Sequence, residues 1–164
     1  MRWALVFVVL LGVCIGAIMP VQPPIPAHPT ATAATHAAQP EADRPIDTLI
    51  TRDDNGHFFA HAEVNGEPVR FIVDTGADMV ALTVEDARRA GVQFSPAQFQ
   101  PIGKSASGVA LGQSVMLDSI VLDGKRVTGV KAAVVDGLEV SLLGQSYLSK
   151  LQSVEMHGDS MTLR

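Results

Sequence analysis

The sequence predicts an all-β domain: a closed barrel of short strands with one or two short helices. From residue 47 onward, short runs rich in β-branched and aromatic residues recur, and turn signals built on Gly, Asn and Asp separate them. Within several runs apolar residues alternate with polar ones, as in strands that bury one face. Many short strands and few helices are typical of barrels, because closure removes the exposed edges of a sheet.

The clearest strand pair is a hairpin formed by residues 57–64 and 69–73. Asn65-Gly66 lies between them and is a favoured two-residue hairpin turn. The first strand alternates, so one of its faces is expected to be buried. The residues of that face are Phe58, Ala60, Ala62 and Val64.

The other elements are expected in order along the chain. Further strands are predicted at residues 48–51, 79–82, 115–122, 127–135, 142–143, 153–156 and 161–163. Thr83 can cap a helix over residues 84–90, and Gly91 ends it. A second short helix is expected over residues 145–151.

The composition indicates one domain with extensions and no cofactor. The chain has 164 residues, 47% of them hydrophobic, which suffices for one core. The formal net charge of −5 disfavours nucleic acid as a partner. Cys14 is the only cysteine, so no intrachain disulfide can form. His57 and His61 share a strand face without a third ligand, so no metal site is expected.

Residues 1–20 are predicted to form a membrane segment. Arg2 precedes 17 residues without a charge, residues 3–19. That run is long for a signal-peptide core and slightly short for a span of about 20 residues. The positive-inside rule places the N-terminus in the cytoplasm and the following domain in the periplasm, anchored to the inner membrane. A cleaved signal peptide is the alternative. A lipoprotein signal at residues 11–14 is disfavoured, because Val13 stands where a small residue is expected.

Residues 21–46 are predicted to be a disordered tether. They are rich in Pro, Ala and Thr, carry few charges and show no sustained apolar period. Such a composition cannot bury a core. The globular domain is therefore expected to occupy residues 47–164, held away from the membrane surface.

The stretch with most chemical information is Phe-Ile-Val-Asp-Thr-Gly-Ala at residues 71–77. Its apolar run predicts a buried strand that ends at Asp74. A carboxylate in such a place is costly unless it is paired or hydrogen-bonded, so it calls for a functional reason. Thr75 supplies a hydroxyl and Gly76 lets the backbone turn sharply. The pattern indicates acid–base catalysis by a carboxylate.

This heptad resembles the active-site loop of aspartic proteases. A second segment, Ser-Leu-Leu-Gly-Gln-Ser-Tyr-Leu at residues 141–148, is similar to the apolar-apolar-Gly element before the C-terminal helix of retropepsin-like proteases. The two motifs stand in the family's order, about 70 residues apart. Over residues 48–163 the chain resembles retropepsin-like proteases, nearest to their bacterial membrane-anchored members.

The resemblance implies roles for the residues of both motifs. Asp74 would be the catalytic carboxylate, and Thr75 would hydrogen-bond across a dimer interface. Gly76 would present backbone to the substrate, and Ala77 would pack beside the site. A structural role behind the catalytic loop is implied for Leu142, Leu143 and Gly144.

The resemblance also implies a substrate-binding side. Asp78 matches a family residue that binds the substrate main chain, but the Arg that pairs with it in the family is Gln145 here. Residues 103–112 stand where the family carries its flap, a mobile hairpin that closes over bound peptide. Ser107 and Gly108 lie near the centre of that segment and would contact substrate. An ordinary surface hairpin is the alternative.

One Asp-Thr-Gly in one chain provides half of an aspartic protease site, which needs two carboxylates sharing a proton. The resemblance therefore implies a homodimer with one Asp74 from each subunit. The expected function is an aspartic endopeptidase that cleaves a polypeptide through water activated by this dyad. One alternative is a catalytically silent module that binds peptides or dimerises. Another is a structural domain in which Asp-Thr-Gly is a coincidence.

Overall fold

The computed structural model of the chain describes residues 45–105 and 108–164. The predicted membrane segment, residues 1–20, and nearly all of the predicted tether, residues 21–46, lie outside the described residues. Within the described part, no helix has both the length and the apolar character needed to cross a membrane.

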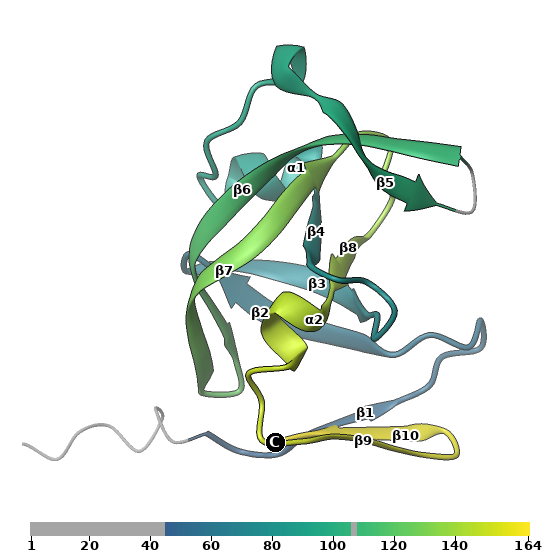
Figure 1. Ribbon diagram of the computed structural model, residues 1–164. Helices are drawn as coiled ribbons and strands as arrows, with labels where there is room; N and C mark the ends of the chain where they lie inside the picture. The colour runs from purple at the N-terminus through teal and green to yellow at the C-terminus, as the bar shows by residue number, and fades with distance from the viewer. Residues whose placement is uncertain (1–44, 106–107) are drawn as a thin grey trace, which may run out of the picture. The chain divides into compact units, whose positions relative to one another are not determined.

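Short strands dominate the described part of the chain (Figure 1). The strands are β1 (Thr48–Thr51), β2 (Phe59–Val64), β3 (Glu67–Val73), β4 (Val80–Thr83), β5 (Gln100–Ser105), β6 (Gly108–Leu122), β7 (Lys125–Val135), β8 (Ser141–Leu143), β9 (Val154–His157) and β10 (Ser160–Leu163). The helices are α1 (Val84–Arg89) and α2 (Gln145–Leu148), with a short 3-10 helix η2 (Pro96–Gln98).

Six strands close a barrel. The larger sheet has the order β2-β3-β8-β4-β7-β6-β5, and β2 also pairs with β6, which closes the ring. β5 extends the sheet beyond β6. The remaining strands form a separate antiparallel sheet in the order β1-β10-β9, at the bottom of Figure 1. The predicted all-β closed barrel with two short helices is confirmed.

The predicted Asn65-Gly66 turn, and the turn between β6 and β7, have the backbone angles that two-residue hairpin turns require. Asn65 and Gly66 have φ values of 52° and 90°, and Asp123 and Gly124 have 47° and 77°. Positive φ at both central positions matches the right-handed twist of the flanking strands. The face of the first strand that was expected to be buried is indeed buried: Phe58, Ala60, Ala62 and Val64.

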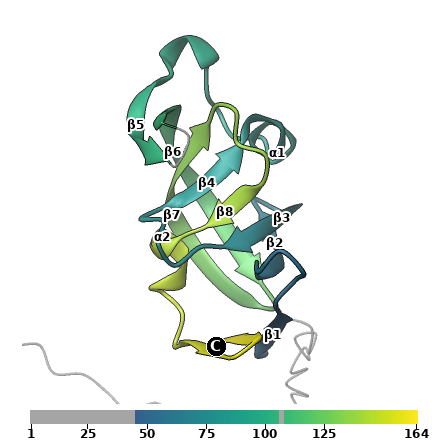
Figure 2. The same ribbon diagram turned by 90° about the vertical axis from the view of Figure 1, so that its right-hand side faces the viewer.

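β8 is the strand that places the two sequence motifs together. It lies between β3 and β4 in the sheet, parallel to β3 and antiparallel to β4 (Figure 2). The register pairs Val73 with Leu143. The end of β3 and the end of β8 therefore lie side by side, although about 70 residues separate them in sequence.

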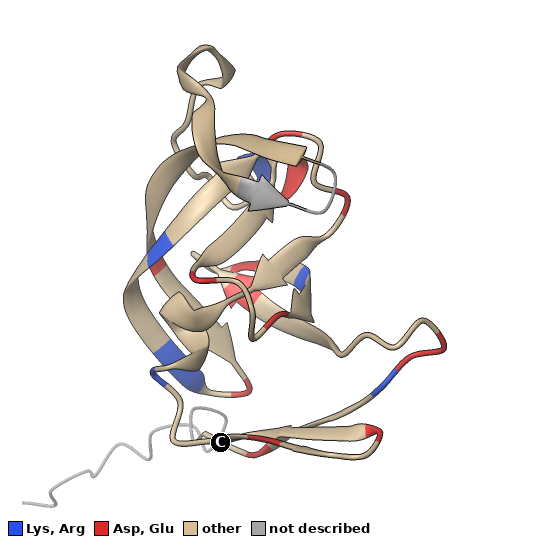
Figure 3. Cartoon of the chain, turned by 45° about the vertical axis from the view of Figure 1, so that its right-hand side comes forward, with Lys and Arg blue, Asp and Glu red and all other residues tan. Residues whose placement is uncertain are grey.

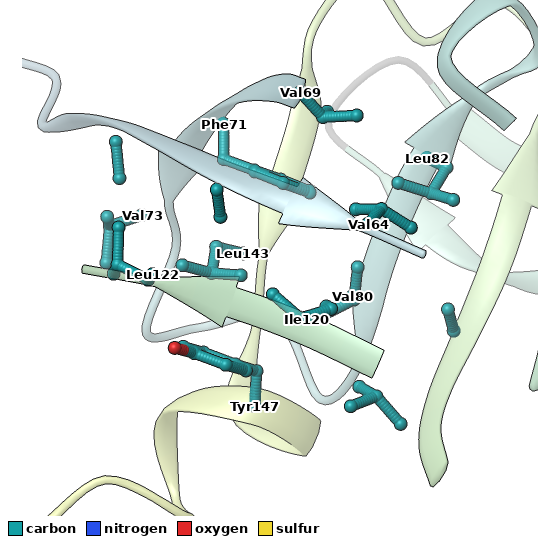
Figure 4. Close-up of a cluster of buried hydrophobic side chains, with 14 of the residues drawn as sticks. Val64, Val69, Phe71, Val73, Val80, Leu82, Ile120, Leu122, Leu143 and Tyr147 are labelled. Atoms are coloured by element: carbon teal, nitrogen blue, oxygen red, sulfur yellow. The ribbon is translucent and has the colours of Figure 1, made fainter. Parts of the chain in front are cut away.

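Apolar side chains from most strands fill the barrel (Figure 4). The fully buried side chains include Phe71, Leu82, Leu117, Ile120, Leu122, Leu143 and Tyr147. The hydroxyl of Tyr147 donates to the carbonyl oxygen of Lys125 at 2.9 Å, so its buried polar atom is satisfied. Burial raises the pKa of Tyr147, because the charged phenolate would lose its hydration.

The first helix follows the predicted capping pattern, whereas the second is shorter than predicted. The Thr83 hydroxyl accepts a hydrogen bond from the backbone N–H of Asp86 at 3.0 Å, which caps α1. α2 ends at Leu148, not at residue 151. Turns continue the chain to Leu151, whose N–H donates to the carbonyl oxygen of Leu148 at 3.2 Å, and Ser153 then pairs with Arg164.

β6 is longer than the predicted strand over residues 115–122. It runs without interruption from Gly108 to Leu122, and residues 108–112 of the expected flap segment are its first part. The glycines do not break it, because β5 pairs with its start and β7 pairs with it from Gly112 onward. The 3-10 helix η2, just before β5, was not predicted either.

A buried lysine, Lys125, forms hydrogen bonds to the first residues of the domain. The ammonium group of Lys125 donates to the carbonyl oxygen of Ile46 and to the hydroxyl of Thr48, the latter at 2.9 Å. Thr48 in turn donates to the carboxylate of Asp123 at 2.5 Å. Burial lowers the pKa of Lys125, and the nearby Asp123 and Asp47 oppose that shift. This contact holds β1 against the turn between β6 and β7.

Truncation of Leu143 tests the assigned core. Leu143→Ala is expected to lower the free energy of unfolding by about 2–5 kcal/mol, because a fully buried leucine leaves a cavity when shortened. Leu49→Ala is the control, since Leu49 is 72% exposed, and it should change stability by less than about 0.5 kcal/mol. Urea denaturation followed by circular dichroism measures both. Equal effects of the two substitutions would contradict the assigned core.

Candidate active site

Asp74 lies directly after the last residue of β3. Its backbone N–H donates to the carbonyl oxygen of Leu143 at 3.1 Å, which extends the parallel pairing of β3 and β8 by one residue. Its Oδ1 accepts from the N–H of Gly76 at 2.9 Å, and its carbonyl oxygen accepts from the N–H of Ala77 at 3.3 Å. The carboxylate is therefore oriented by its own loop, and the residue is half-buried.

Gln145 holds the same loop from behind. Its backbone N–H donates to the carbonyl oxygen of Ala77 at 2.8 Å. Its side-chain Nε2 donates to the carbonyl oxygen of Thr75, also at 2.8 Å. Two bonds from one residue at the start of α2 thus fix the backbone on both sides of Gly76. A neutral amide thus supports the loop at the position where the resemblance implies an Arg.

Gly144 lets the two segments approach this closely. A Cβ at this position would lie 2.7 Å from the carbonyl oxygen of Ala77 and closer still to that of Met79. Both obstacles are backbone atoms, so no side-chain movement could relieve the clash. Gly144 and Leu143 are buried behind the loop, whereas Leu142 is half-buried.

A cavity of about 330 Å³ opens beside the Asp74 carboxylate. The alternation along β3 buries Phe71 and Val73 in the barrel and leaves Ile72 outside it. The cavity is lined by Gly56, His57, Phe58, Ile72, Val73, Asp74 and Leu142. It therefore combines an apolar wall with the candidate catalytic carboxylate and one imidazole.

The contribution of the loop between β1 and β2 to this cavity was not anticipated from sequence. The backbone N–H of Val73 donates to the carbonyl oxygen of Phe58 at 2.8 Å, which continues the ladder of β2 and β3 by one residue and places the end of the loop beside the end of β3. His57, which the alternating pattern assigned to a solvated strand face, lies at the cavity as a result. The same loop carries charges of both signs (Figure 3). The hairpin predicted through Asn65-Gly66 already places Phe58 opposite Val73, but it does not show that a cavity lies there.

Of the residues expected to bind substrate, Asp78 and Gly108 lie on different segments of the described chain. Asp78 is exposed, and within the described residues its carboxylate forms no hydrogen bond or ion pair. The amide of Gln145 is directed to Thr75 instead. Gly108 starts β6 with a φ of 123°, and Ser107 lies outside the described residues.

The expected flap segment is a hairpin of β5 and the first part of β6. The strands pair from Gln100 with Gly112 to Ser105 with Gly108, with one irregularity between Pro101 and Gly103. The start of β6 also exposes two large apolar side chains, those of Val109 and Leu111. Exposed apolar residues on such a hairpin are suited to contact with a ligand.

A mainly apolar groove of about 350 Å³ starts at Met79, five residues beyond Asp74. It is lined by Met79, Ser114, Val115, Met116, Lys131 and Ala132. In the described part of the chain, no three His, Cys, Asp or Glu side chains are grouped so that they could hold a metal ion. The reactive group of this region is therefore the carboxylate of Asp74, which lies beside apolar surface.

Comparison with known proteins agrees with this geometry. The family profile described as aspartyl protease matches residues 60–147, which include the Asp74 loop, β8 and the start of α2. This chain therefore belongs to the aspartyl protease family, and its fold is retropepsin-like. The crystal structure of a retropepsin-like aspartic protease from Rickettsia conorii is similar, with a TM-score of 0.61 and 32% sequence identity. The match covers 72% of this chain and 90% of that one.

Two curated relatives are also similar in sequence. An uncharacterized protein encoded in the cobV 5′ region of Sinorhizobium sp is 38% identical over 112 residues. The uncharacterized protein RP867 of Rickettsia prowazekii (strain Madrid E) is 33% identical over 116 residues. The matches cover 67% and 70% of this chain but 48% and 50% of those proteins. The chain thus spans about half the length of the curated relatives it matches.

Substitution of Gly144 tests the close contact behind the loop. Gly144→Ala is expected to lower the free energy of unfolding by about 1–3 kcal/mol, because the new methyl group must displace the backbone at Ala77 and Met79. Gly103→Ala is the matched control, since a Cβ there meets no atom within 4 Å. Thermal and urea unfolding measure the difference. A Gly144→Ala chain as stable as Gly103→Ala would show that the loop is not held in this way.

Proposed function

We propose that this chain is an aspartic endopeptidase that hydrolyses peptide bonds of a protein substrate through a pair of Asp74 residues from two copies of the chain. The observation that carries the proposal is the Asp74 carboxylate itself. It lies in a loop held from behind by Leu143 and Gln145, and it faces an open cavity with an apolar wall. Family membership supports the same reaction class.

The reaction needs one carboxylate as base and one carboxylic acid as proton donor. The ionised Asp74 takes a proton from water while the water oxygen bonds to the peptide carbonyl carbon. The protonated Asp74 of the partner subunit gives its proton to the carbonyl oxygen, and a tetrahedral diol forms. Its collapse breaks the C–N bond, the nitrogen gains a proton, and an acid and an amine leave. Two neighbouring like charges resist joint ionisation, so the pair naturally keeps one proton.

The homodimer follows from the number of motifs. The sequence contains one Asp-Thr-Gly, so a single chain supplies one of the two carboxylates. A two-fold axis beside the Asp74 loop would bring the second carboxylate to the same water in an isologous contact. The exposed Thr75 is placed by this proposal at the contact between the two loops, where its hydroxyl would bond across the axis.

The proposed substrate is an extended polypeptide with apolar side chains near the cleaved bond. Ile72 and Leu142 form the apolar wall beside Asp74. Val109 and Leu111, on the hairpin of β5 and β6, would cover the peptide from the other side and exclude water. The carboxylate of Asp78 would accept hydrogen bonds from the substrate main chain, and Ser107 and Gly108 of the expected flap segment would contact the substrate.

We propose a membrane-tethered arrangement for the whole chain. Residues 1–20 would anchor it in the inner membrane with the N-terminus in the cytoplasm, and residues 21–46 would space the protease domain from the membrane on the periplasmic side. The support is the uncharged run after Arg2 and the Pro- and Ala-rich composition that follows.

Replacement of the catalytic carboxylate tests the reaction. Asp74→Asn should reduce cleavage of a diverse peptide library by at least about a hundredfold, because an amide cannot accept the proton from water. Asp118→Asn, a change at an exposed position of β6, is the matched control and should keep full activity. Mass spectrometry of the products measures both. Cleavage that survives in Asp74→Asn would refute the proposed mechanism.

The pH dependence tests the shared proton. The rate should decline as pH rises, because ionisation of both carboxylates removes the acid that protonates the carbonyl oxygen. Initial rates on one peptide would be measured from about pH 4 to about pH 9, with circular dichroism at each pH to verify folding. A flat profile across that range in a folded chain would count against a carboxylate pair.

A further inference from the structure

The cavity beside Asp74 has one side chain in its wall that can gain a positive charge, that of His57. The cavity has a volume of about 330 Å³, and its other lining residues are Gly56, Phe58, Ile72, Val73, Asp74 and Leu142. His57 and Asp74 are therefore the two ionisable residues of this wall. The proposed reaction uses the carboxylate and leaves the imidazole without a part. The imidazole is thus available for contact with a side chain of the substrate.

The imidazole of His57 is positioned by its own loop. The Oδ1 of Asp53 accepts a hydrogen bond from the backbone N–H of His57 at 2.6 Å and lies 3.8 Å from Nδ1 of the ring. The ring also packs edge to face against Phe59, with the two centroids 6.1 Å apart. Within the part of the chain that the structure describes, Nε2 forms no hydrogen bond or ion pair. His57 is exposed, so Nε2 can be reached by a ligand.

Asp53 keeps its charge in the pH range in which histidine titrates. The hydrogen bond from the backbone N–H of His57 is the main cause that lowers the pKa of Asp53, and hydrogen bonds from Asn55 add to it. One of these, from the backbone N–H of Asn55, has a length of 3.1 Å. Protonated His57 therefore has a carboxylate on its Nδ1 side.

Two arginines of the same region stack on aromatic rings and do not line the cavity. The guanidinium carbon of Arg70, on β3, lies 3.6 Å from the centroid of the Phe59 ring. The guanidinium carbon of Arg52 lies 4.5 Å from the centroid of the Phe58 ring. Neither arginine is part of the cavity wall. A negatively charged ligand in the cavity would therefore find its cation in His57.

We propose that His57 is a specificity-determining residue whose protonated imidazole binds the carboxylate of an acidic side chain, Glu or Asp, of the polypeptide substrate. The inference rests on the proposed function, because the cavity belongs to the site only if Asp74 is catalytic. Nε2–H would donate to the carboxylate on the side of the ring away from Asp53. Hydrogen bonds between charged groups are stronger than those between neutral ones.

Two negative charges oppose this contact and limit its strength. The pair of Asp74 residues shares one proton, so it carries a single charge over two residues. Asp53 faces Nδ1, so it lies farther from a carboxylate bound at Nε2 than the imidazolium does. Salt also screens charges that are exposed to solvent. The expected preference for an acidic over a neutral side chain is therefore modest, roughly threefold.

The preference should depend on pH. Histidine is charged in mildly acidic solution and neutral in mildly alkaline solution. Glutamate in a peptide is already ionised at about pH 5.5, so the contact is then an ion pair. At about pH 7.5 the neutral imidazole no longer attracts a carboxylate, whereas Asp53 and Asp74 still repel it. The preference for Glu over Gln should therefore be lost as pH rises.

Competition between paired peptides tests the contact in the full chain, held in mild detergent. A library peptide that the chain cleaves would be made with Glu or with Gln at each position near the cleaved bond. Both versions are mixed in one reaction, so the ratio of their kcat/KM values does not depend on the protonation of Asp74. At one position the Glu-to-Gln ratio should be roughly three at about pH 5.5 and one or less at about pH 7.5.

Variants assign this ratio to the imidazole. His57→Gln should reduce the ratio to one or less at both pH values. His57→Lys should keep the preference for Glu at both, because its positive charge persists. His61→Gln is the matched control, since His61 is exposed on β2 and does not line the cavity, and it should keep the wild-type ratio. Ratios that are the same in wild type and His57→Gln at every position would overturn the inference.

Histidine titration by NMR provides a readout that does not depend on catalysis. The Asp74→Asn chain would bind the paired peptides without cutting them. The signal of His57, identified by its loss in His57→Gln, should titrate at least about 0.5 pH units higher with the Glu peptide than with the Gln peptide. A threefold preference for the protonated form and a shift of about that size are the same linkage. Equal midpoints with the two peptides would overturn the inference.

These measurements separate the inference from the proposed reaction. Cleavage that depends on Asp74, with a Glu-to-Gln ratio that does not respond to His57, would refute the contact and leave the protease intact. A shift of the His57 signal by the Glu peptide, in a chain that cleaves no peptide, would support the contact and refute the protease. A chain that neither cleaves nor binds any peptide of the library would refute both.

Discussion

The pairing of β3 with β8 is the contact on which the candidate site depends. It is parallel, so it needs a long connection, and here it joins two segments about 70 residues apart in sequence. The ladder does not stop with the strands, because Asp74 still bonds to Leu143 beyond the last pair of β3. Gln145 extends these contacts with two hydrogen bonds to the loop, one to the carbonyl oxygen of Ala77 and one to that of Thr75. A continuous set of hydrogen bonds thus runs from the barrel core to the loop of the carboxylate.

In β3 and β8, some residues stabilise the barrel while their neighbours line the candidate site. Phe71 and Leu143 lie in the core and hold the strands, while Ile72 and Leu142, one residue away in each strand, line the cavity. Period-two alternation therefore provides the scaffold and the substrate wall with the same two strands. Pre-organisation of this kind matters for acid–base catalysis, since a misplaced carboxylate cannot meet the proton it must take.

The barrel and the motifs were accessible from sequence because their signals are local. The Asn65-Gly66 turn, the Thr83 cap and the alternation of Phe58 to Val64 each depend on neighbouring residues, and each agrees with the structure. Resemblance added the position of the Asp74 loop and the strand behind it. The end of α2 was predicted three residues too late, because residues 149–151 form turns that the local sequence does not distinguish from a helix.

Other features depend on contacts between distant segments. His57 has the pattern of a solvated strand residue, yet the hairpin of β2 and β3 places it at the cavity beside Asp74. In the sequence, Gln145 stands in place of the Arg that pairs with Asp78 in the family. In the structure, its side-chain amide donates to the carbonyl oxygen of Thr75. The continuity of β6 through its glycines depends on β5 and β7 on either side. The contact of Gln145 with Thr75 and the pairing of β6 with β5 and β7 leave no period or motif in the chain.

The most direct measurement of the central claim, that two chains build one site, is activity in mixed dimers. Wild-type chain and Asp74→Asn would be refolded together at a fixed total concentration and increasing mutant fraction. If each site needs Asp74 from both subunits, activity should fall as the square of the wild-type fraction, because mixed dimers are inactive. Activity that falls in direct proportion to the wild-type fraction would contradict the account, since each chain would then carry a complete site.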